Sequence, residues 1–182
     1  MSSFYSDDEL KEIGFKSFGK NLLLSRKASI YSPQNMTIGD NVRIDDYCIL
    51  SGKITLGSHI HVSAYVALYG AMGIVMEDYS GISAKSVVYS AMDDFSGDYL
   101  IGPIHPEGTT NVTGGEVKIG RFVQIGVNTV IFPEVEIGEG SVVGACSLVK
   151  RSLKPWGIYA GIPCRIIKPR SKNLLQYVTE KP

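Results

Sequence analysis

Aliphatic residues recur at every sixth position along most of this 182-residue chain. A first run covers residues 38–74, a second covers 119–149, and a shorter one at 76–88 keeps the step after a shift of two residues. The members are Ile38, Ile44, Leu50, Leu56, Val62, Leu68 and Ile74; Met76, Ile82 and Val88; and Ile119, Ile125, Ile131, Ile137, Val143 and Val149. A helix repeats about every 3.6 residues and a half-buried strand every 2, so neither produces this pattern. A strict hexad is typical of a parallel β-helix, in which each hexad supplies one side of a coil.

Three hexads, about 18 residues, close one triangular coil. The first residue of each hexad should therefore point inward and stack on its equivalent one coil later. By this count about three coils precede Val88 and two follow Ile119. The second hexad position is often glycine, and we expect these glycines at tight corners with positive φ. They are Gly39, Gly57, Gly120, Gly126, Gly138 and Gly144.

The two ends of the chain lack the hexad pattern. Ser6-Asp7-Asp8-Glu9 is a capping box, which predicts a short N-terminal helix over the open first coil. We therefore divide the chain into an N-terminal helical cap (1–25), a β-helix domain (26–168) and a C-terminal tail (169–182). The tail is expected to form a short closing helix.

Bulk properties exclude several classes of function. Lys and Arg together number 18, as do Asp and Glu, so no net charge attracts a nucleic acid or an anionic membrane. The first residues lack a basic and apolar leader, and no apolar run approaches the roughly 20 residues that span a bilayer. We expect a soluble, cytoplasmic protein. Its three cysteines show no metal-binding spacing, and Cys48 sits where a small buried side chain is wanted.

The repeat is interrupted between residues 89 and 118 and then resumes in step. This insert is polar and rich in glycine and proline, so it should form a loop extruded from the prism. Long loops in compact folds are usually either functional or disordered. The insert carries Asp93 and Asp94 at its start and His105 between two prolines. The other histidines, His59 and His61, fall on outward or turn positions of a regular hexad and are expected to be surface residues.

The hexads, the extruded loop and the ending GIYAGIPCRIIKPR together resemble the hexapeptide-repeat acyltransferases. These enzymes are left-handed β-helical trimers that move acetyl from acetyl-CoA to a sugar amine or hydroxyl. The runs DDFSGDYLIGP, TNVTGGEVKIG and SLKPWGIYAGIPCRIIKPRSKNLL are most similar to surface-polysaccharide acyltransferases of the dTDP-viosamine N-acetyltransferase type. The segment VKIGRFVQIGVNTVIFPEVEIGEGSVVGACSLV is also similar to the maltose and galactoside O-acetyltransferases. The resemblance implies a cytoplasmic homotrimer that uses acetyl-CoA as co-substrate and no metal.

Two positions depart from the maltose and galactoside enzymes. Asp93 stands at the place of their catalytic histidine, and Gln124 stands where they carry a tryptophan. We therefore take His105 and Asp93 as the candidate catalytic residues and Asp94 as a candidate ligand of the acceptor. An amine needs a weaker base than a hydroxyl, and in some relatives the leaving thiolate takes the proton. The missing histidine therefore favours N-acetylation of a nucleotide-linked amino-deoxy sugar, with O-acetylation of a saccharide hydroxyl as the alternative.

The resemblance also implies where coenzyme A binds. The backbone at Gly144 and Ala145 should contact the pantetheine, and four basic residues should hold the phosphates, which accept charge-assisted hydrogen bonds. These four are Lys150, Arg151, Arg165 and Lys168. The residues argue against two rival functions. A carbonic anhydrase on this fold needs three zinc-binding histidines at a spacing that is absent here, and a non-catalytic trimeric scaffold would not need the basic segment.

Overall fold

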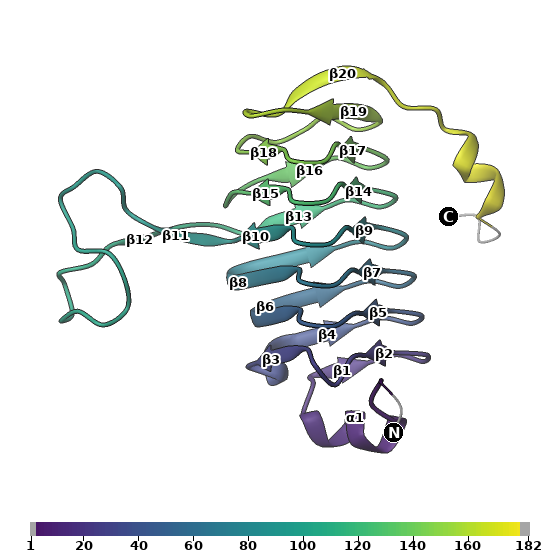
Figure 1. Ribbon diagram of the computed structural model, residues 1–182, viewed down its shortest axis with the longest axis horizontal. Coiled ribbons are helices and arrows are strands. Elements are labelled where there is room, and N and C mark those ends of the chain that lie inside the picture. Colours follow the sequence, from purple (N-terminus) through teal and green to yellow (C-terminus); the bar gives the residue numbers. More distant parts are fainter. Residues whose placement is uncertain (1–2, 179–182) are drawn as a thin grey trace.

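The hexads wind into a prism of stacked coils in the computed structural model, which describes residues 3–178 (Figure 1). The prism consists of a ten-stranded and an eight-stranded sheet. The first contains β1 (Ser17–Phe18), β3 (Ser29–Tyr31), β4 (Met36–Ile38), β6 (Ile49–Leu56), β8 (Ala67–Met76), β10 (Val87–Tyr89), β13 (Val117–Ile119), β15 (Val130–Ile131), β16 (Glu136–Ile137) and β18 (Leu148–Val149). The second contains β2 (Leu23–Leu24), β5 (Arg43–Ile44), β7 (His61–Val62), β9 (Gly81–Ile82), β14 (Gln124–Ile125), β17 (Val142–Val143), β19 (Gly157–Ala160) and β20 (Arg165–Pro169).

The predicted stacking of hexad leaders is confirmed. Ile38 pairs with Leu56 and Ile44 with Val62, each one coil of 18 residues apart. Every hexad leader is buried, with an exposed fraction of 3% or less. Seven parallel strands succeed one another in the eight-stranded sheet, from β2 to β19. The stack is therefore about two coils longer than the regular hexads predict, because less regular segments at both ends also join it.

The shift of two residues in the hexad pattern is a local insertion in one coil. Gly52 of β6 pairs with Gly70 of β8, 18 residues later, whereas Ile54 pairs with Ile74, 20 residues later. The two extra residues thus lie between Gly70 and Ile74, at a corner where the register shifts. Ile74 and Met76 are both buried, so the core continues across the insertion.

The expectation of positive φ at the six hexad glycines is wrong. The corner is instead made at the fourth hexad position, where larger residues adopt the left-handed conformation. These include Asn41, Tyr47, His59, Tyr65, Tyr79, Lys85, Phe122, Asn128, Glu134 and Cys146. The second-position glycines serve close approach between coils: a Cβ on Gly126 would lie 2.6 Å from the Ala145 nitrogen.

Both predicted terminal helices are present. In α1 (Asp7–Ile13), Ser6 and Glu9 form the reciprocal capping box, Gly14 ends the helix at φ 86°, and Leu10 is buried against the prism. β1 and β2, within the predicted cap, already pair with the coils. The C-terminal η2 (Asn173–Tyr177) is a 3-10 helix that lies beside the prism (Figure 1), so the expectation that this helix closes the stack is wrong. The strand β20 crosses the C-terminal end of the prism instead (Figure 1). Neither helix, nor any other in residues 3–178, is long and apolar enough to cross a membrane. The ends of the predicted terminal segments, residues 1–2 and 179–182, lie outside the described residues.

The insert leaves the prism as an antiparallel ribbon, as predicted for an extruded loop (Figure 1). Its strands are β11 (Ala91–Asp93) and β12 (Val112–Gly114). The root is fixed where the Ser90 amide donates to the Tyr69 carbonyl (3.0 Å) and the Gly115 amide donates to the Ser90 carbonyl (3.0 Å). Val117 is again buried in the core, so the prism resumes immediately after the ribbon.

The close approach of coils at Gly126 predicts a stability effect. Gly126→Ala should lower the free energy of unfolding by about 1–3 kcal/mol, because the methyl group overpacks the Gly144–Ala145 backbone. Gly81→Ala is the matched control, since a Cβ there is 3.7 Å from its nearest neighbour, the His61 carbonyl oxygen. Denaturant unfolding of both variants checks this, and equal stability of the two would contradict it.

Candidate active site

Two clefts flank the root of the ribbon, and Asp93 lines both. The larger has a volume of about 410 Å³ and is lined by Met92, Asp93, Asp94, Phe95, Thr113, Gly114, Phe132, Pro133 and Glu134. The smaller, of about 220 Å³, is lined by Ala91, Met92, Asp93, Gly102, Pro103, Thr110 and Val112. The ribbon and the next coil of the prism thus build the larger cleft together.

Asp93 is the last residue of β11, where its pairing with Val112 fixes its backbone. Its side chain is half-buried, and its Oδ1 accepts a hydrogen bond from the Gly102 amide at 3.2 Å. A carboxylate mounted on a paired strand can hold a defined position toward a bound acceptor. The predicted catalytic role of Asp93 therefore has a suitable geometric setting.

Asp94 makes hydrogen bonds within the ribbon. Its Oδ1 accepts from the Ser96 amide (2.6 Å), its Oδ2 accepts from Asn111 Nδ2 (2.9 Å), and its own amide donates to the Asn111 carbonyl (2.8 Å). The hydrogen bonds from Ser96 and Asn111 lower the pKa of this carboxyl. Asp94 thus ties the two sides of the ribbon together while also lining the larger cleft.

His105 lies farther out in the loop, beyond Gly102. It is half-buried and lines neither cleft. The ribbon therefore does not bring His105 into the same cleft as Asp93 within this chain, and a catalytic role for His105 stays a prediction.

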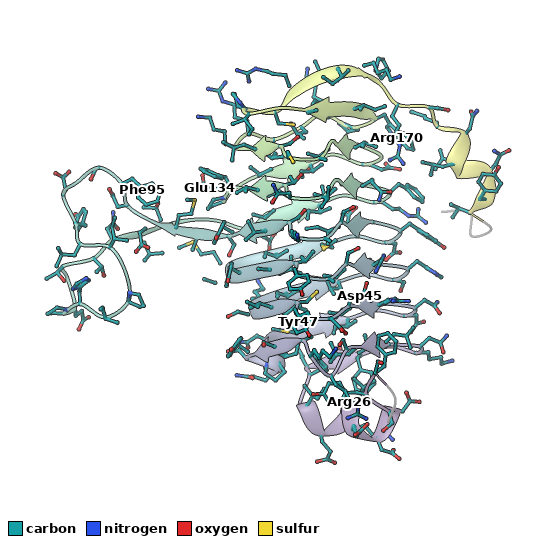
Figure 2. All side chains as sticks on the ribbon, viewed as in Figure 1. Arg26, Asp45, Tyr47, Phe95, Glu134 and Arg170 are labelled. Carbon is teal, nitrogen blue, oxygen red and sulfur yellow. The ribbon has the colours of Figure 1, made fainter. Side chains whose placement is uncertain are left out.

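Reasoning from the sequence missed the contribution of Glu134 and Phe95 to the larger cleft. Figure 2 shows Phe95 on the ribbon and Glu134 on the prism near the ribbon's base. Glu134 has a φ of 61°, and its amide donates to the Gly115 carbonyl at 3.3 Å. Counting hexads with the insert left out would have found this residue. Ile131 is then the third hexad leader after Val88 and pairs with Val88, and Glu134 is the fourth residue of the hexad that begins at Ile131.

Three of the predicted phosphate ligands line a cavity that is separate from the two clefts and is called the cationic cavity below. The cationic cavity has a volume of about 160 Å³ and is lined by Leu148, Lys150, Arg151, Pro163, Cys164 and Arg165. Burial raises the pKa of the Cys164 thiol, which keeps it uncharged among the cations. The cavity therefore offers positive charge without a competing thiolate.

The remaining predicted cofactor residues lie elsewhere. Lys168 is farther along β20, opposite Ile158, and does not line this cavity. Gly144 and Ala145 lie in the turn before β18. The Gly144 amide there donates to the Tyr159 carbonyl of the next coil (2.7 Å). Their proposed contact with pantetheine stays a prediction.

Arg170, which follows the predicted phosphate ligands in the sequence, makes hydrogen bonds to the backbone of the prism. Its Nη1 donates to the carbonyl oxygens of Phe122 (2.8 Å) and Gly140 (3.0 Å). Figure 2 shows it on the side of the prism away from the ribbon. It therefore ties the chain end to two corners and lies apart from the cationic cavity.

The larger cleft and the cationic cavity are neighbours on one side of the prism. Ile131 pairs with Val149, so Phe132 of the cleft lies one coil from Lys150 of the cavity. Successive coils are about 4.8 Å apart. A carboxylate cleft next to three cations suits a reaction between a polar or amine acceptor and a donor that carries phosphates.

The other two histidines have surface partners. His59 stacks on Tyr79 with ring centroids 4.5 Å apart, and His61 Nε2 lies 2.7 Å from Asp45 Oδ2. Both side chains are exposed, as predicted. Across the part of the chain that the structure describes, no three His, Cys, Asp or Glu side chains gather as a metal site would need.

Comparisons with known proteins identify relatives of this chain. A family model for the bacterial transferase hexapeptide (six repeats) matches residues 116–151. The chain is 39% identical over 177 residues to dTDP-4-amino-4,6-dideoxy-D-glucose acyltransferase from Escherichia coli, which covers 96% of this chain and 92% of that protein. It is 29% identical over 149 residues to galactoside O-acetyltransferase of E. coli strain K12, covering 80% of this chain and 69% of that protein.

A solved structure is more similar still. AntD, an N-acyltransferase from Bacillus cereus, is 54% identical and superposes with a TM-score of 0.94, covering 97% of this chain and 95% of AntD. That structure holds dTDP-4-amino-4,6-dideoxyglucose and coenzyme A, and another AntD structure holds dTDP and 3-hydroxybutyryl-CoA.

The hydrogen bonds of Asp94 predict a loss of ribbon order when its charge is removed. Asp94→Asn should increase deuterium uptake across residues 94–111 in hydrogen-exchange mass spectrometry at pH 7, whereas Asp98→Asn, in the same loop, should not. Because the folded carboxyl has a lowered pKa, its stabilising effect is complete above its ordinary value, near 4, and is lost as pH falls through the lowered value. Unchanged uptake in Asp94→Asn would contradict this role.

Proposed function

The chain belongs to the hexapeptide-repeat acyltransferases and shares their left-handed β-helix fold, and we propose that it acylates the amine of a dTDP-linked 4-amino-4,6-dideoxy sugar. The acyl donor in this proposal is acetyl-CoA. The observation that carries the proposal is the position of Asp93, a carboxylate on a paired strand, in clefts one coil from a cationic cavity. The same acceptor is supported by the similarity to dTDP-4-amino-4,6-dideoxy-D-glucose acyltransferase and to AntD, an N-acyltransferase whose structure holds that sugar nucleotide.

The chemistry requires little beyond positioning and one proton acceptor. The neutral amine attacks the thioester carbonyl, so that a C–N bond forms while the C–S bond to coenzyme A breaks. The attacking nitrogen loses one proton, and the Asp93 carboxylate accepts it and passes it to the departing thiolate. An acceptor amine has a pKa far closer to neutrality than a hydroxyl, so a carboxylate suffices as the base. His105 remains a second candidate for this role.

The cleft and the cationic cavity carry opposite charges, so each is suited to a different substrate. The carboxylates of Asp93 and Glu134 in the larger cleft favour a cationic or hydroxyl-bearing acceptor and repel phosphates. Lys150, Arg151 and Arg165 attract the phosphates of coenzyme A one coil away. The thioester then extends from the cationic cavity toward Asp93. Gly144 and Ala145 would support the pantetheine, and Lys168 would add charge farther along β20.

The proposed assembly is a homotrimer with each active site between two subunits. The ribbon supports this, because a single chain leaves large apolar side chains of the loop uncovered: Phe95 is 72% exposed and Ile104 is 87% exposed. Exposed apolar groups of this size are typical of contact surfaces. A partner subunit that packs on the ribbon would also close the clefts toward water. We place the enzyme in the cytoplasm, in the synthesis of bacterial surface polysaccharide such as O-antigen.

A saccharide hydroxyl is the second candidate acceptor. The similarity to galactoside O-acetyltransferase favours it. Asp93 stands against it, since the related O-acetyltransferases use a histidine at this position. The family membership sets aside the non-catalytic scaffold.

The acceptor class is tested by measuring coenzyme A release by mass spectrometry with acetyl-CoA and two acceptors in parallel. Turnover is expected with dTDP-4-amino-4,6-dideoxyglucose, because the free amine is the nucleophile. No turnover is expected with a neutral oligosaccharide that offers only hydroxyls. Turnover on the hydroxyl acceptor alone would establish O-acetylation instead. A parallel run with 3-hydroxybutyryl-CoA determines which acyl chain is preferred.

Substitution of the candidate base is the second test. Asp93→Asn should lower kcat at least about 10²-fold, because the amide cannot accept the proton, and His105→Ala should do so if His105 contributes the base. The oligomeric state by light scattering should not change. Glu107→Gln removes an exposed loop carboxylate and serves as the control. Full activity of both Asp93→Asn and His105→Ala would show that the assignment of these two residues as candidate bases is wrong.

A further inference from the structure

The two-residue insertion in the coil before the ribbon takes no part in the reaction proposed above. In the preceding coil a single residue, Lys53, connects the two paired segments of β6. The corresponding place in β8 holds three residues, 71–73, between Gly70 and Ile74, and these form a bulge at this corner of the prism. Since β6 turns the same corner without two extra residues, closure of the coil does not explain the bulge.

The bulge meets the ribbon at Ser90, the residue that precedes β11. β10 pairs with β8, so the ribbon leaves the prism directly beside the coil that carries the bulge (Figure 1). Ser90 is fully buried, and its Oγ accepts a hydrogen bond from the Met72 amide (2.9 Å) and donates one to the Tyr69 carbonyl (3.0 Å). A hydroxyl can donate and accept at once. This one side chain therefore ties the root of the ribbon to two residues of the coil beneath it.

The returning strand of the ribbon is held at the same point. The Gly115 amide donates to the Ser90 carbonyl (3.0 Å), and a Cβ on Gly114 would clash with that carbonyl. Glu116 follows, and a Cβ on Gly73 of the bulge would lie 3.2 Å from its Oε2. The bulge thus packs beside both ends of the ribbon, next to Ser90 where the ribbon leaves and next to Glu116 where it returns.

The bulge itself has a fixed base. A Cβ on Gly70 would lie 2.6 Å from the carbonyl oxygen of Lys53, so the backbone of the bulge rests directly on the coil below. Gly70 and Gly73, at its two ends, are buried, whereas Ala71 and Met72 at its tip are exposed. The coil below therefore supports the position from which the Met72 amide reaches Ser90.

The distance along the strand from Ser90 to Asp93 makes this contact important for the proposed base. β11 is paired with β12 along its whole length, so the ribbon pivots at its root as one body. Three residues of strand span about 10 Å, so a tilt of about 10° at Ser90 displaces Asp93 by about 2 Å. A misplacement of about 1 Å can lower a rate about 10²-fold.

We infer that Ser90 and the bulge form a clamp that sets the angle at which the ribbon leaves the prism, and that Ser90 is a positioning residue for the Asp93 carboxylate. The inference rests on the proposed function, in which Asp93 accepts the proton of the acceptor amine. It gives the shift of two residues in the hexad pattern a role in the reaction, although none of the bulge residues lines either cleft.

Two variants remove the clamp from opposite sides. Ser90→Ala removes the hydroxyl, and deletion of Ala71 and Met72 gives this corner the spacing of the preceding coil. Each should lower kcat for the amino sugar at least about 10-fold, because Asp93 is displaced from the acceptor. The Kd of coenzyme A should not change in either variant. Ser90→Ala decides the question by itself if the deletion variant does not fold.

Ser58→Ala is the matched control for loss of a hydroxyl between coils. Ser58 Oγ accepts a hydrogen bond from the Asp40 amide of the adjacent coil (3.0 Å), at a corner that carries no ribbon. Its removal should leave kcat unchanged.

A second background separates positioning from a general loss of structure. When Asp93→Asn is already present, Ser90→Ala should cause no further loss of kcat, because residues that act through one another have non-additive effects. A residue that only stabilises the fold would lower kcat by the same factor in both backgrounds.

Hydrogen-exchange mass spectrometry tests the clamp without any reaction. Deuterium uptake should rise across residues 91–93 and 112–114 in both clamp variants and should stay unchanged across residues 36–62. Unchanged uptake in the ribbon, full kcat in Ser90→Ala, or an equal loss of kcat in the Asp93→Asn background would each overturn the inference.

These outcomes are distinct from failure of the proposed function. If the unchanged protein acylates the amino sugar, the proposed function survives every result with the clamp variants. If the unchanged protein does not acylate it, the proposed function is wrong, and exchange in the ribbon alone then decides whether Ser90 and the bulge hold its root.

Discussion

Backbone hydrogen bonding between successive coils is the constraint on which the rest of this structure depends. Outside the insert, most short strands have their partner about 18 residues away, so every rung is fixed by the rung before it, and the aliphatic hexad leaders stack into a continuous core. Because the coils are about 4.8 Å apart, side chains facing a neighbouring backbone must be small. This explains why glycine follows so many hexad leaders, as at Gly126. It also sets the spacing of every outward side chain along the prism.

That same regularity permits the extruded ribbon. Val88, before the insert, pairs with Ile131, the third hexad leader after it, as it would if the insert were absent. The prism therefore supports the ribbon rigidly at both ends. Asp93 is thereby held beside residues that are distant in sequence, among them Glu134 of the following coil. The insert interrupts the regular coils, and the candidate active site lies at the root of the ribbon that the insert forms.

Charge then divides the corner into zones. Carboxylates occupy the cleft at the ribbon root, and cations occupy the cavity one coil beyond it. An acyl-CoA carries its charge on phosphates far from the thioester, so phosphates held in the cationic cavity would bring the reactive end toward the proposed base, Asp93. The distance between the carboxylate cleft and the cationic cavity is set by the spacing of the coils, because equivalent residues of successive coils lie above one another at a fixed interval. Substrates of extended shape are well matched to such a column.

The sequence by itself determined the periodic fold, the buried hexad leaders, the capping box at Ser6 and the place where the loop leaves the prism. These features are local or strictly periodic, so composition and spacing suffice to find them. It also pointed to Asp93. Only the tertiary structure decided which residues share a cleft, because the insert and the coils bring together positions more than 40 residues apart, such as Asp93 and Glu134. The backbone angles at the corners were likewise decided by packing between coils, which no single hexad reveals. Glycine lies where coils touch, whereas the left-handed turns are formed by larger residues such as Tyr47, held by the rungs on either side.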